Sequence, residues 1–405
     1  MARFRRPRPL ATESRALVIL LGAMTALVAL AIDMSLPALP TLSREFGATP
    51  DTVQLTLSLF ILGYGAGQLV YGPLSDRFGR RRMLLIGLAM YMAAGLACAV
   101  SPRIEILIAA RIVMGFGGCV GPVLARAIVR DHFGGARAAQ VFSSLTAVFA
   151  VGPLVAPVIG GFLLVHFGWQ SIFLLLCAFG AALFAIIALR LAESLKEPDP
   201  HALRLGRLAG NYRAFLTNRV CVGYAFVNGL CWAGIFAFLS GSPFVFIEVY
   251  GVAPEHYGFY FGLSAVSLVA GAMSNKFLLR RFRAETVLKF GFAMTIGGGA
   301  VGLGIALSPA AGALGFMAGL MIYIYGQAVV MPNAMAGGME PVARMAGTAA
   351  SLMGAIQMGC GAIVGYFVNA LYDGTAVPMA AIILLMGVVA TAVYYLMLRP
   401  KRVAG

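Results

Sequence analysis

Twelve windows of about 20 mainly apolar residues follow one another along the chain, and this series limits the possible folds more than any other feature. They cover residues 16–38, 52–74, 83–101, 103–126, 138–164, 169–190, 219–247, 256–279, 287–308, 311–332, 346–370 and 375–398. A helix needs about 20 such residues to cross the hydrocarbon core of a bilayer. Only 11% of the 405 residues are charged, whereas soluble domains contain about 25%. The sequence therefore predicts an all-α membrane protein with twelve transmembrane helices and excludes a soluble enzyme.

The basic residues follow the order of these windows. All but three of the 30 Lys and Arg residues fall in or next to alternate connections or the chain ends; the exceptions are Arg44, Arg103 and Arg111. Because short loops rich in Lys and Arg stay in the cytoplasm, we expect both termini on the cytoplasmic side. The net charge of +15 is then a topology signal, which favours the lipid bilayer as a partner and argues against nucleic acid.

The longest polar stretch between windows divides the chain into two halves with six spans each. The predicted organisation is a basic N-terminus at 1–15, a six-helix bundle at 16–192, a cytoplasmic linker at 193–218, a second six-helix bundle at 219–398 and a cytoplasmic tail at 399–405. The halves share one short pattern, since GPLSDRF at 72–78 follows the second span and GAMSNKF at 271–277 follows the eighth. Parallel six-helix repeats occur in secondary transporters, where the substrate site lies between the repeats.

The connection after the second span reads GPLSDRFGRRR. Gly72 allows a close helix approach and Gly79 permits a tight turn. Asp76 can accept hydrogen bonds at a helix N-terminus or pair with an arginine, and we expect it to face the N-terminus of span eleven or Arg126 and Arg130. Because the connection lies at the membrane surface, we interpret it as a conformational latch rather than a transport site. The predicted latch residues are Gly72, Asp76, Arg77, Gly79, Arg80 and Arg81.

This spacing of glycines, acid and arginines resembles the signature of the major facilitator superfamily. The segment 107–118 resembles a second motif of that family, with Met114 where glutamine is usual. The stretches AIDMSLPALP, QLTLSLF and LARAIVRD are similar to the branch that confers bicyclomycin and chloramphenicol resistance (Bcr/CflA type). The resemblance is close over residues 15–195 and rests on hydropathy and length in the second half. It implies the major facilitator fold and a place in the bacterial inner membrane.

The fifth span contains AVGPLVAPVIGGFL at 150–163, which resembles a third motif, associated with drug/proton antiporters. Its predicted antiporter residues are Gly152, Pro153, Pro157, Gly160 and Gly161. The prolines should kink the helix, and the glycine pair should allow close helix packing. The resemblance therefore implies antiport rather than symport.

Two ionisable residues lie well inside the apolar windows, Asp33 in the first span and Arg111 in the fourth. Such groups are costly in a membrane and are functional candidates by default. At 1.5 Å per residue, both lie at a similar depth, so an ion pair is possible, either direct or through water. Burial favours a neutral carboxyl and a nearby guanidinium favours an ionised one. Asp33 is therefore the predicted proton carrier, and Arg111 either tunes it or helps to position the substrate; the alternative is a purely structural pair that joins two helices.

Polar and aromatic residues in the spans are weaker candidates for substrate contact, because each can equally be a packing residue of the helix bundle. The candidates are Gln54, Tyr64, Asn228, Trp232, Phe236 and Gln357. Neither the six cysteines nor the four histidines have the spacing of metal ligands, so we expect no metal site and no catalytic residues.

The driving force is expected to be a proton gradient without a cofactor. No lysine follows a glycine, which excludes the Walker A nucleotide-binding motif. The predicted function is proton-coupled efflux of small amphipathic drugs of the phenicol or bicyclomycin type, by alternating access and as a monomer. The alternatives are a proton-coupled transporter of a physiological metabolite and a membrane sensor that keeps the fold without transport.

Overall fold

The computed structural model describes residues 14–133, 135–195, 197–200, 205–308 and 312–398. The predicted N-terminal segment 1–15 and tail 399–405 lie almost wholly outside these residues. All the secondary-structure elements within them are helices, joined by short turns and loops. The first half contains α1 (Arg15–Asp33), η1 (Leu36–Ala38), α2 (Leu39–Phe46), α3 (Pro50–Phe78), α4 (Arg80–Ala99), α5 (Ile104–Gly118), α6 (Val120–His132), α7 (Gly135–Phe167) and α8 (Gln170–Arg190). The second half contains α10 (Arg219–Pro243), η2 (Phe244–Val249), α11 (Pro254–Leu278), α12 (Ala284–Leu307), α13 (Gly312–Met339), η4 (Glu340–Met345), α14 (Ala346–Ala370), α15 (Val377–Val393) and η5 (Tyr394–Leu398).

The twelve predicted spans correspond to this series of helices. Eleven helical stretches among the described residues are long and apolar enough to cross a membrane, and α7 runs beside them as the twelfth, packed against α1 and α11. Five spans are composite. In the first half the chain continues from α1 through η1 into α2 and from α5 into α6; in the second half it continues from α10 into η2, from α13 into η4 and from α15 into η5. The fold is the one predicted, two six-helix halves in one membrane-spanning bundle.

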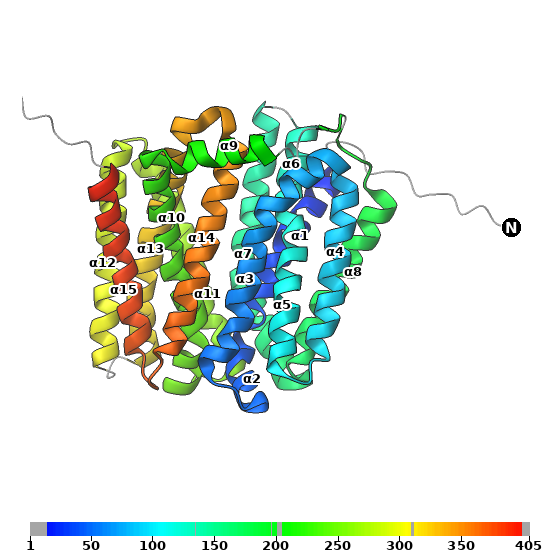
Figure 1. Ribbon diagram of the computed structural model, residues 1–405. Helices are drawn as coiled ribbons and strands as arrows, with labels where there is room; N and C mark the ends of the chain where they lie inside the picture. Colours follow the sequence, from blue (N-terminus) through cyan, green and yellow to red (C-terminus); the bar gives the residue numbers. More distant parts are fainter. Residues whose placement is uncertain (1–13, 134, 196, 201–204, 309–311, 399–405) are drawn as a thin grey trace, which may run out of the picture.

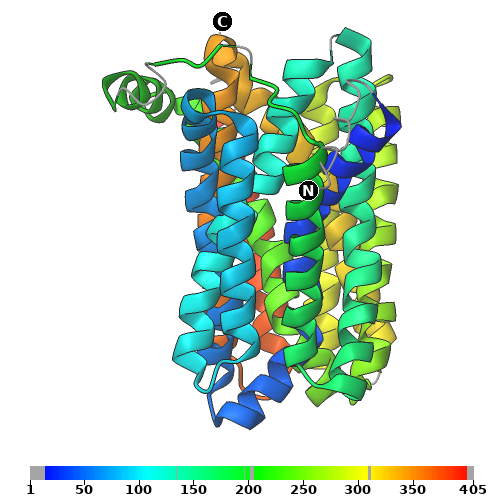
Figure 2. The same cartoon turned by 90° about the vertical axis from the view of Figure 1, so that its right-hand side faces the viewer.

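The two halves lie side by side, with α10–α15 on the left and α1–α8 on the right of Figure 1, and Figure 2 shows the bundle from its side. They meet along two pairs of helices, α3 with α14 and α7 with α11. A shorter helix, α9 (Leu205–Leu216), lies across one edge of the bundle. We call this edge the α9 end and the opposite edge, where α2 lies, the α2 end.

The linker predicted at 193–218 is therefore partly helical. In α9 the Phe215 side chain is fully buried in a cluster with Cys221 of α10 and Ala349 of α14. Burial of one aromatic side chain stabilises such a contact by about 1.5–3 kcal/mol, so α9 is anchored to the second half.

The first helix ends at Asp33, and two prolines explain why. Pro37 and Pro40 lie in η1 and α2, and neither has a backbone N–H to donate one turn back. The carbonyl of Asp33 accordingly lacks the donor that residue 37 would supply in a continuous helix. Asp33 lies at a helix break rather than in the middle of a helix.

Candidate functional site

Arg111 lies on α5 and is 1% exposed, with its guanidinium pointing into the first half. Nε donates to the carbonyl of Thr56 at 3.1 Å, Nη1 to the carbonyl of Ala31 at 3.1 Å and Nη2 to Oγ of Ser35 at 3.2 Å. The guanidinium also lies 4.3 Å from the ring centre of Phe60, in cation–π contact. Neutral acceptors and an aromatic ring therefore hold this buried charge.

Asp33 lies between two residues that Arg111 contacts, but it forms no ion pair with Arg111. Ala31 and Ser35, the two contacts of Arg111 on this segment, flank Asp33 on either side. None of the ion pairs found among the described residues joins Asp33 to Arg111. The predicted direct ion pair is thus not present, because the guanidinium is occupied by the helix break itself.

Asp33 lies near the second half instead, because η1, which begins three residues later, contacts α10 and α11. Asp33 is 4% exposed, and it interacts electrostatically with Tyr257 of α11, in the second half. The Tyr257 hydroxyl is in turn 2.7 Å from Oγ of Ser242 on α10. A buried acid without an ion pair, at the contact of two bodies, has the position that a proton-binding group requires.

The glycines of the predicted antiporter motif make close contacts on both sides of α7. A Cβ atom at Gly152 would lie 3.0 Å from Cβ of Ala29, and one at Gly160 would overlap the backbone of Met34, both in the first half. At Gly161 it would lie 2.5 Å from the carbonyl oxygen of Pro254, at the start of α11. Neighbouring glycines therefore pack against different halves.

The expected kinks are not accompanied by a break in α7. The helix is continuous from Gly135 to Phe167, through Pro153 and Pro157. The side chain of Pro153 lies outside the described part of the structure, and Pro157 is buried.

The residues predicted to form a surface loop and latch are largely helical. Residues 72–78 form the last two turns of α3, and the turn to α4 is Gly79 alone, with a φ of +95°. The expected close approach at Gly72 is not present, since a Cβ there would have no neighbour within 4 Å. The reason is that Gly72 lines an open cavity rather than a helix contact.

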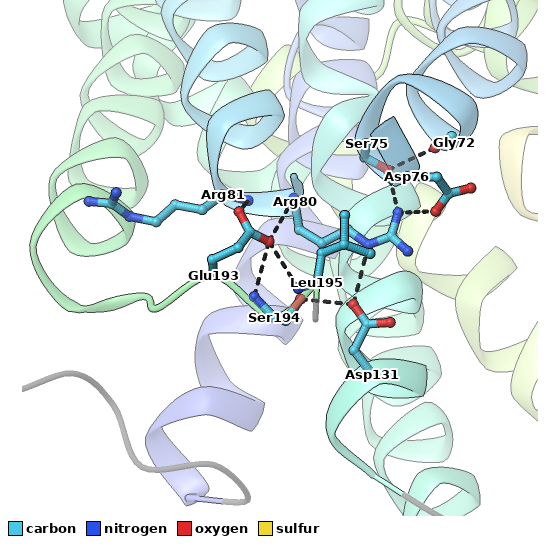
Figure 3. A network of polar contacts seen from close by, with 9 residues as sticks. All are labelled: Gly72, Ser75, Asp76, Arg80, Arg81, Asp131, Glu193, Ser194 and Leu195. Carbon is cyan, nitrogen blue, oxygen red and sulfur yellow. Dashed lines mark hydrogen bonds and ion pairs between the residues drawn. The ribbon is translucent and has the colours of Figure 1, made fainter. Parts of the chain in front are cut away.

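Arg80 is the centre of the latch network in Figure 3. Its Nη1 lies 2.5 Å from Oδ1 of Asp76 and donates to Oγ of Ser75 at 2.6 Å, while its Nε donates to Oδ2 of Asp131 on α6 at 3.2 Å. Arg80 is buried, whereas 47% of the Asp76 side chain is exposed. One arginine thus joins the ends of α3, α4 and α6.

A cavity of about 340 Å³ opens beside this network at the α9 end. Asp76 lines it together with Arg126 and Arg130, and Thr348 and Ser351 of α14 form the opposite wall. Asp76 therefore shares the cavity with both groups that it was predicted to face, but its ion pair is with Arg80. Arg77 is exposed beside Phe78, at 5.4 Å from the ring centre.

Glu193 is a member of the network that the sequence analysis missed. Its carboxylate accepts from the backbone N–H groups of Arg80 at 2.8 Å and Arg81 at 3.0 Å, the first two residues of α4. Ser194 then donates from Oγ to Asp131 at 2.8 Å. Arg81 meanwhile donates from Nη2 to the carbonyl of Ala188 at 2.6 Å, near the end of α8. The only signal in the sequence was an acid directly after the sixth span.

The predicted substrate candidates fall into two groups. Asn228 donates to Oε1 of Gln357 at 3.0 Å within the second half, and Tyr64 hydrogen-bonds with Gln68 of its own helix. The other three, Gln54, Trp232 and Phe236, meet where α3, α10 and α14 come together. The structure thus brings together half of the candidates.

Comparison with known proteins identifies the same architecture. A sequence profile described as Major Facilitator Superfamily matches residues 21–366. The chain is 35% identical to the MFS-type transporter YdgK of Bacillus subtilis, over 96% of both chains. It is 32% identical to a bicyclomycin resistance protein homolog of Haemophilus influenzae, over 93% of this chain and 95% of that one. Its fold superimposes on a D-xylose–proton symporter with a TM-score of 0.73 and 16% identity, covering 96% and 99% of the two chains.

Proposed function

The chain belongs to the major facilitator superfamily, and we propose that it is a proton-coupled exporter of small amphipathic drugs in the bacterial inner membrane. Its fold and relatives point to transport rather than catalysis. Similarity to a bicyclomycin resistance protein homolog, and at 29% identity to a chloramphenicol resistance protein of Pseudomonas aeruginosa, supports a drug of the bicyclomycin or phenicol type. The protein would work as a monomer, since the two halves of one chain contribute both walls of the interface. It would use the proton gradient and no cofactor.

The ends of the bundle support a direction for the transport cycle. Most short basic connections lie at the α9 end, so this end would face the cytoplasm. It contains the cavity between α3, α6 and α14. At the α2 end, Gly161 of α7 packs against Pro254 of α11, and Gly258 of α11 packs against Val158 of α7. Closure at one end and a cavity at the other correspond to the loading stage of alternating access.

The observation that carries proton coupling is the environment of Asp33. It is a buried acid at the break of α1, lies against the second half and has no ion pair with Arg111. A group at the contact of two moving bodies changes its surroundings during the cycle. Protonation from outside and release inside would then be coupled to the rocking of the halves.

Transport into liposomes tests this function. Purified protein under an imposed pH gradient should move chloramphenicol uphill in exchange for protons, whereas Asp33→Asn should lose the pH-driven component at least tenfold. Asp373→Asn is the matched control, because Asp373 is an exposed aspartate in the loop between α14 and α15. Full proton-driven transport by Asp33→Asn would remove Asp33 from the mechanism, and drug movement in the same direction as protons would replace antiport by symport.

A further inference from the structure

Three helices meet around Gly365 of α14, and their side chains leave polar atoms without partners there. Both amide atoms of Gln54, Oγ of Ser58, Nε1 of Trp232 and Oδ1 of Asn369 are buried and have no hydrogen-bond partner. Gln54 and Ser58 come from α3 in the first half, whereas Trp232 and Asn369 come from α10 and α14 in the second. We call these four side chains the interface polar set.

The contacts around Gly365 place Gln54, Trp232 and Asn369 along about two turns of α14 at the interface. A Cβ atom at Gly365 would lie 2.7 Å from the Phe236 ring and 3.3 Å from Nε2 of Gln54. One turn earlier, a Cβ at Gly361 would lie 3.2 Å from Nε1 of Trp232. The amide nitrogen of Asn369 donates to the carbonyl of Gly365 at 3.1 Å, so only its oxygen is left over. Ser58 follows Gln54 by one turn, on the same face of α3.

Buried polar atoms without partners at the interface between the halves lower the stability of the protein unless a bound molecule forms hydrogen bonds with them. A buried donor or acceptor without a partner loses its hydrogen bonds to water and gains none in the folded protein. Leucine at Gln54 or Asn369 would avoid this cost and would suit an interface of apolar spans. The unpaired atoms include donors and acceptors, with no ionisable side chain among them and two aromatic rings beside them.

We propose that the interface polar set recognises an uncharged substrate that carries both hydrogen-bond donors and acceptors next to an apolar group. Amide- or hydroxyl-bearing antibiotics have this chemistry, and lipophilic cations without hydrogen-bonding groups do not. When the halves separate along α3 and α14, Gln54 and Asn369 offer one donor and two acceptors, and Trp232 offers a second donor. Phe236 and the Trp232 ring cover the apolar part of the substrate. This inference rests on the proposed drug export and specifies its substrate class.

Binding and transport of two probes test the proposal. Chloramphenicol is uncharged and carries an amide and hydroxyl groups, whereas tetraphenylphosphonium is a cation without hydrogen-bonding groups. Dissociation constants in detergent and uptake into liposomes should be measured for the wild type, Gln54→Leu and Asn369→Leu. Gln327→Leu is the matched control: Gln327 is another buried glutamine with an unpaired oxygen, but it bonds Tyr323 inside the second half. Thermal melting and gel filtration establish that each variant is folded, and Gln54→Ala replaces Gln54→Leu if the latter aggregates.

We expect the dissociation constant for chloramphenicol to rise about tenfold in Gln54→Leu and Asn369→Leu, because each variant removes hydrogen bonds to the substrate. Any binding of tetraphenylphosphonium should change less than twofold, and Gln327→Leu should leave both probes unaffected. Unchanged chloramphenicol binding in both folded interface variants would overturn the inference while leaving drug export intact. Wild-type transport of tetraphenylphosphonium but not of chloramphenicol would also overturn the inference while leaving drug export intact. If the wild type binds and moves neither probe, the proposed function itself fails.

Discussion

Arg111 shows how a buried charge can be structural even where the sequence suggests an ionic switch. Its N–H groups donate to the carbonyl of Ala31 on α1, to the hydroxyl of Ser35 between α1 and η1, and to the carbonyl of Thr56 on α3. Two of the three acceptors, Ala31 and Ser35, lie on either side of the helix break at Asp33. The arginine therefore stabilises the break at which Asp33 lies, and it positions the acid without binding it.

Replacing Arg111 by lysine should destabilise the protein by about 2–4 kcal/mol, because an ammonium cannot span the same acceptors and leaves some of them unpaired. The loss should be the same in an Asp33→Asn background, since the two side chains do not pair. Thermal melting of the two single variants and the double variant measures this coupling. A double variant clearly more stable than the sum of the single effects would reveal an ion pair after all.

The sequence allowed individual residues of the candidate site to be predicted, but not the contacts between them. Asp33 and Arg111 were identifiable because ionisable groups are rare in apolar windows. Their depth follows from the rise per residue, but the direction of each side chain around its helix does not, so the sequence could not decide whether the two side chains pair directly; the structure shows no direct ion pair between them. Glu193 was out of reach because it contacts Arg80, 113 residues earlier in the chain.

Gly160 and Gly161 of α7 allow packing within the first half and packing between the halves to be tested separately. Gly160→Ala should lower stability by about 1–3 kcal/mol, as overpacking does, because its Cβ overlaps Met34 within the first half. Gly161→Ala should leave the halves folded but open the α2 end, because its Cβ meets Pro254 of the other half. Melting curves and spin-label distances between α7 and α11 distinguish the two outcomes. Gly297→Ala is the control, as a Cβ there has no neighbour within 4 Å. An unchanged α7–α11 distance in Gly161→Ala would contradict this assignment.

Glu193 caps α4 from the linker. A carboxylate that accepts from the first N–H groups of a helix contributes about 1 kcal/mol, so Glu193→Ala should lower stability by that amount and Glu193→Gln by less. Gly79→Ala should cost more than Glu193→Ala, because a φ of +95° strains a residue with a side chain and its Cβ would also lie 2.6 Å from Oε2 of Glu193. Chemical denaturation of the purified protein measures these differences, with the exposed Glu197→Ala as control. Equal stability of Glu193→Ala and the wild type would show that water replaces the cap.

Hydropathy predicted the helices well within the apolar windows, but it placed the helix ends inaccurately where the apolar residues stop. The twelve windows match the spans because a bilayer demands about 20 apolar residues per helix. The actual ends extend further: α3 continues past residue 74 to Phe78, and α13 continues past residue 332 to Met339. Backbone hydrogen bonding does not require apolar side chains, so hydropathy underestimates these ends. The same limit hid α9, which Phe215 anchors to the second half.

The molecule as a whole is asymmetric despite its internal repeat. In the first half, Asp76 and Arg80 form a charged network with Asp131. At the equivalent place in the second half, Asn275 accepts from the amide of Asn333 at 2.8 Å, a neutral pair. At these equivalent positions, the first half carries charges whose partners can change when the cavity at the α9 end closes, whereas the second half has a neutral amide pair. We expect the rate of rocking to depend mainly on this half.

Asp76→Asn tests this asymmetry. The substitution removes the ion pair with Arg80 but leaves Arg80 bound to Asp131 and Ser75, so the fold should persist. Substrate affinity should stay within twofold, because the cavity-lining Asp76 lies about three helical turns beyond Gly65 and about six beyond Gln54 on α3. Turnover should fall several-fold, because the network no longer distinguishes the open and closed cavity. Glu285→Gln provides the comparison: Glu285 forms an exposed pair with Lys289 at the same spacing in the second half. Equal turnover in both variants would mean that the charges of the first half do not control the cycle, and a rise in the dissociation constant for Asp76→Asn would instead assign Asp76 to substrate binding.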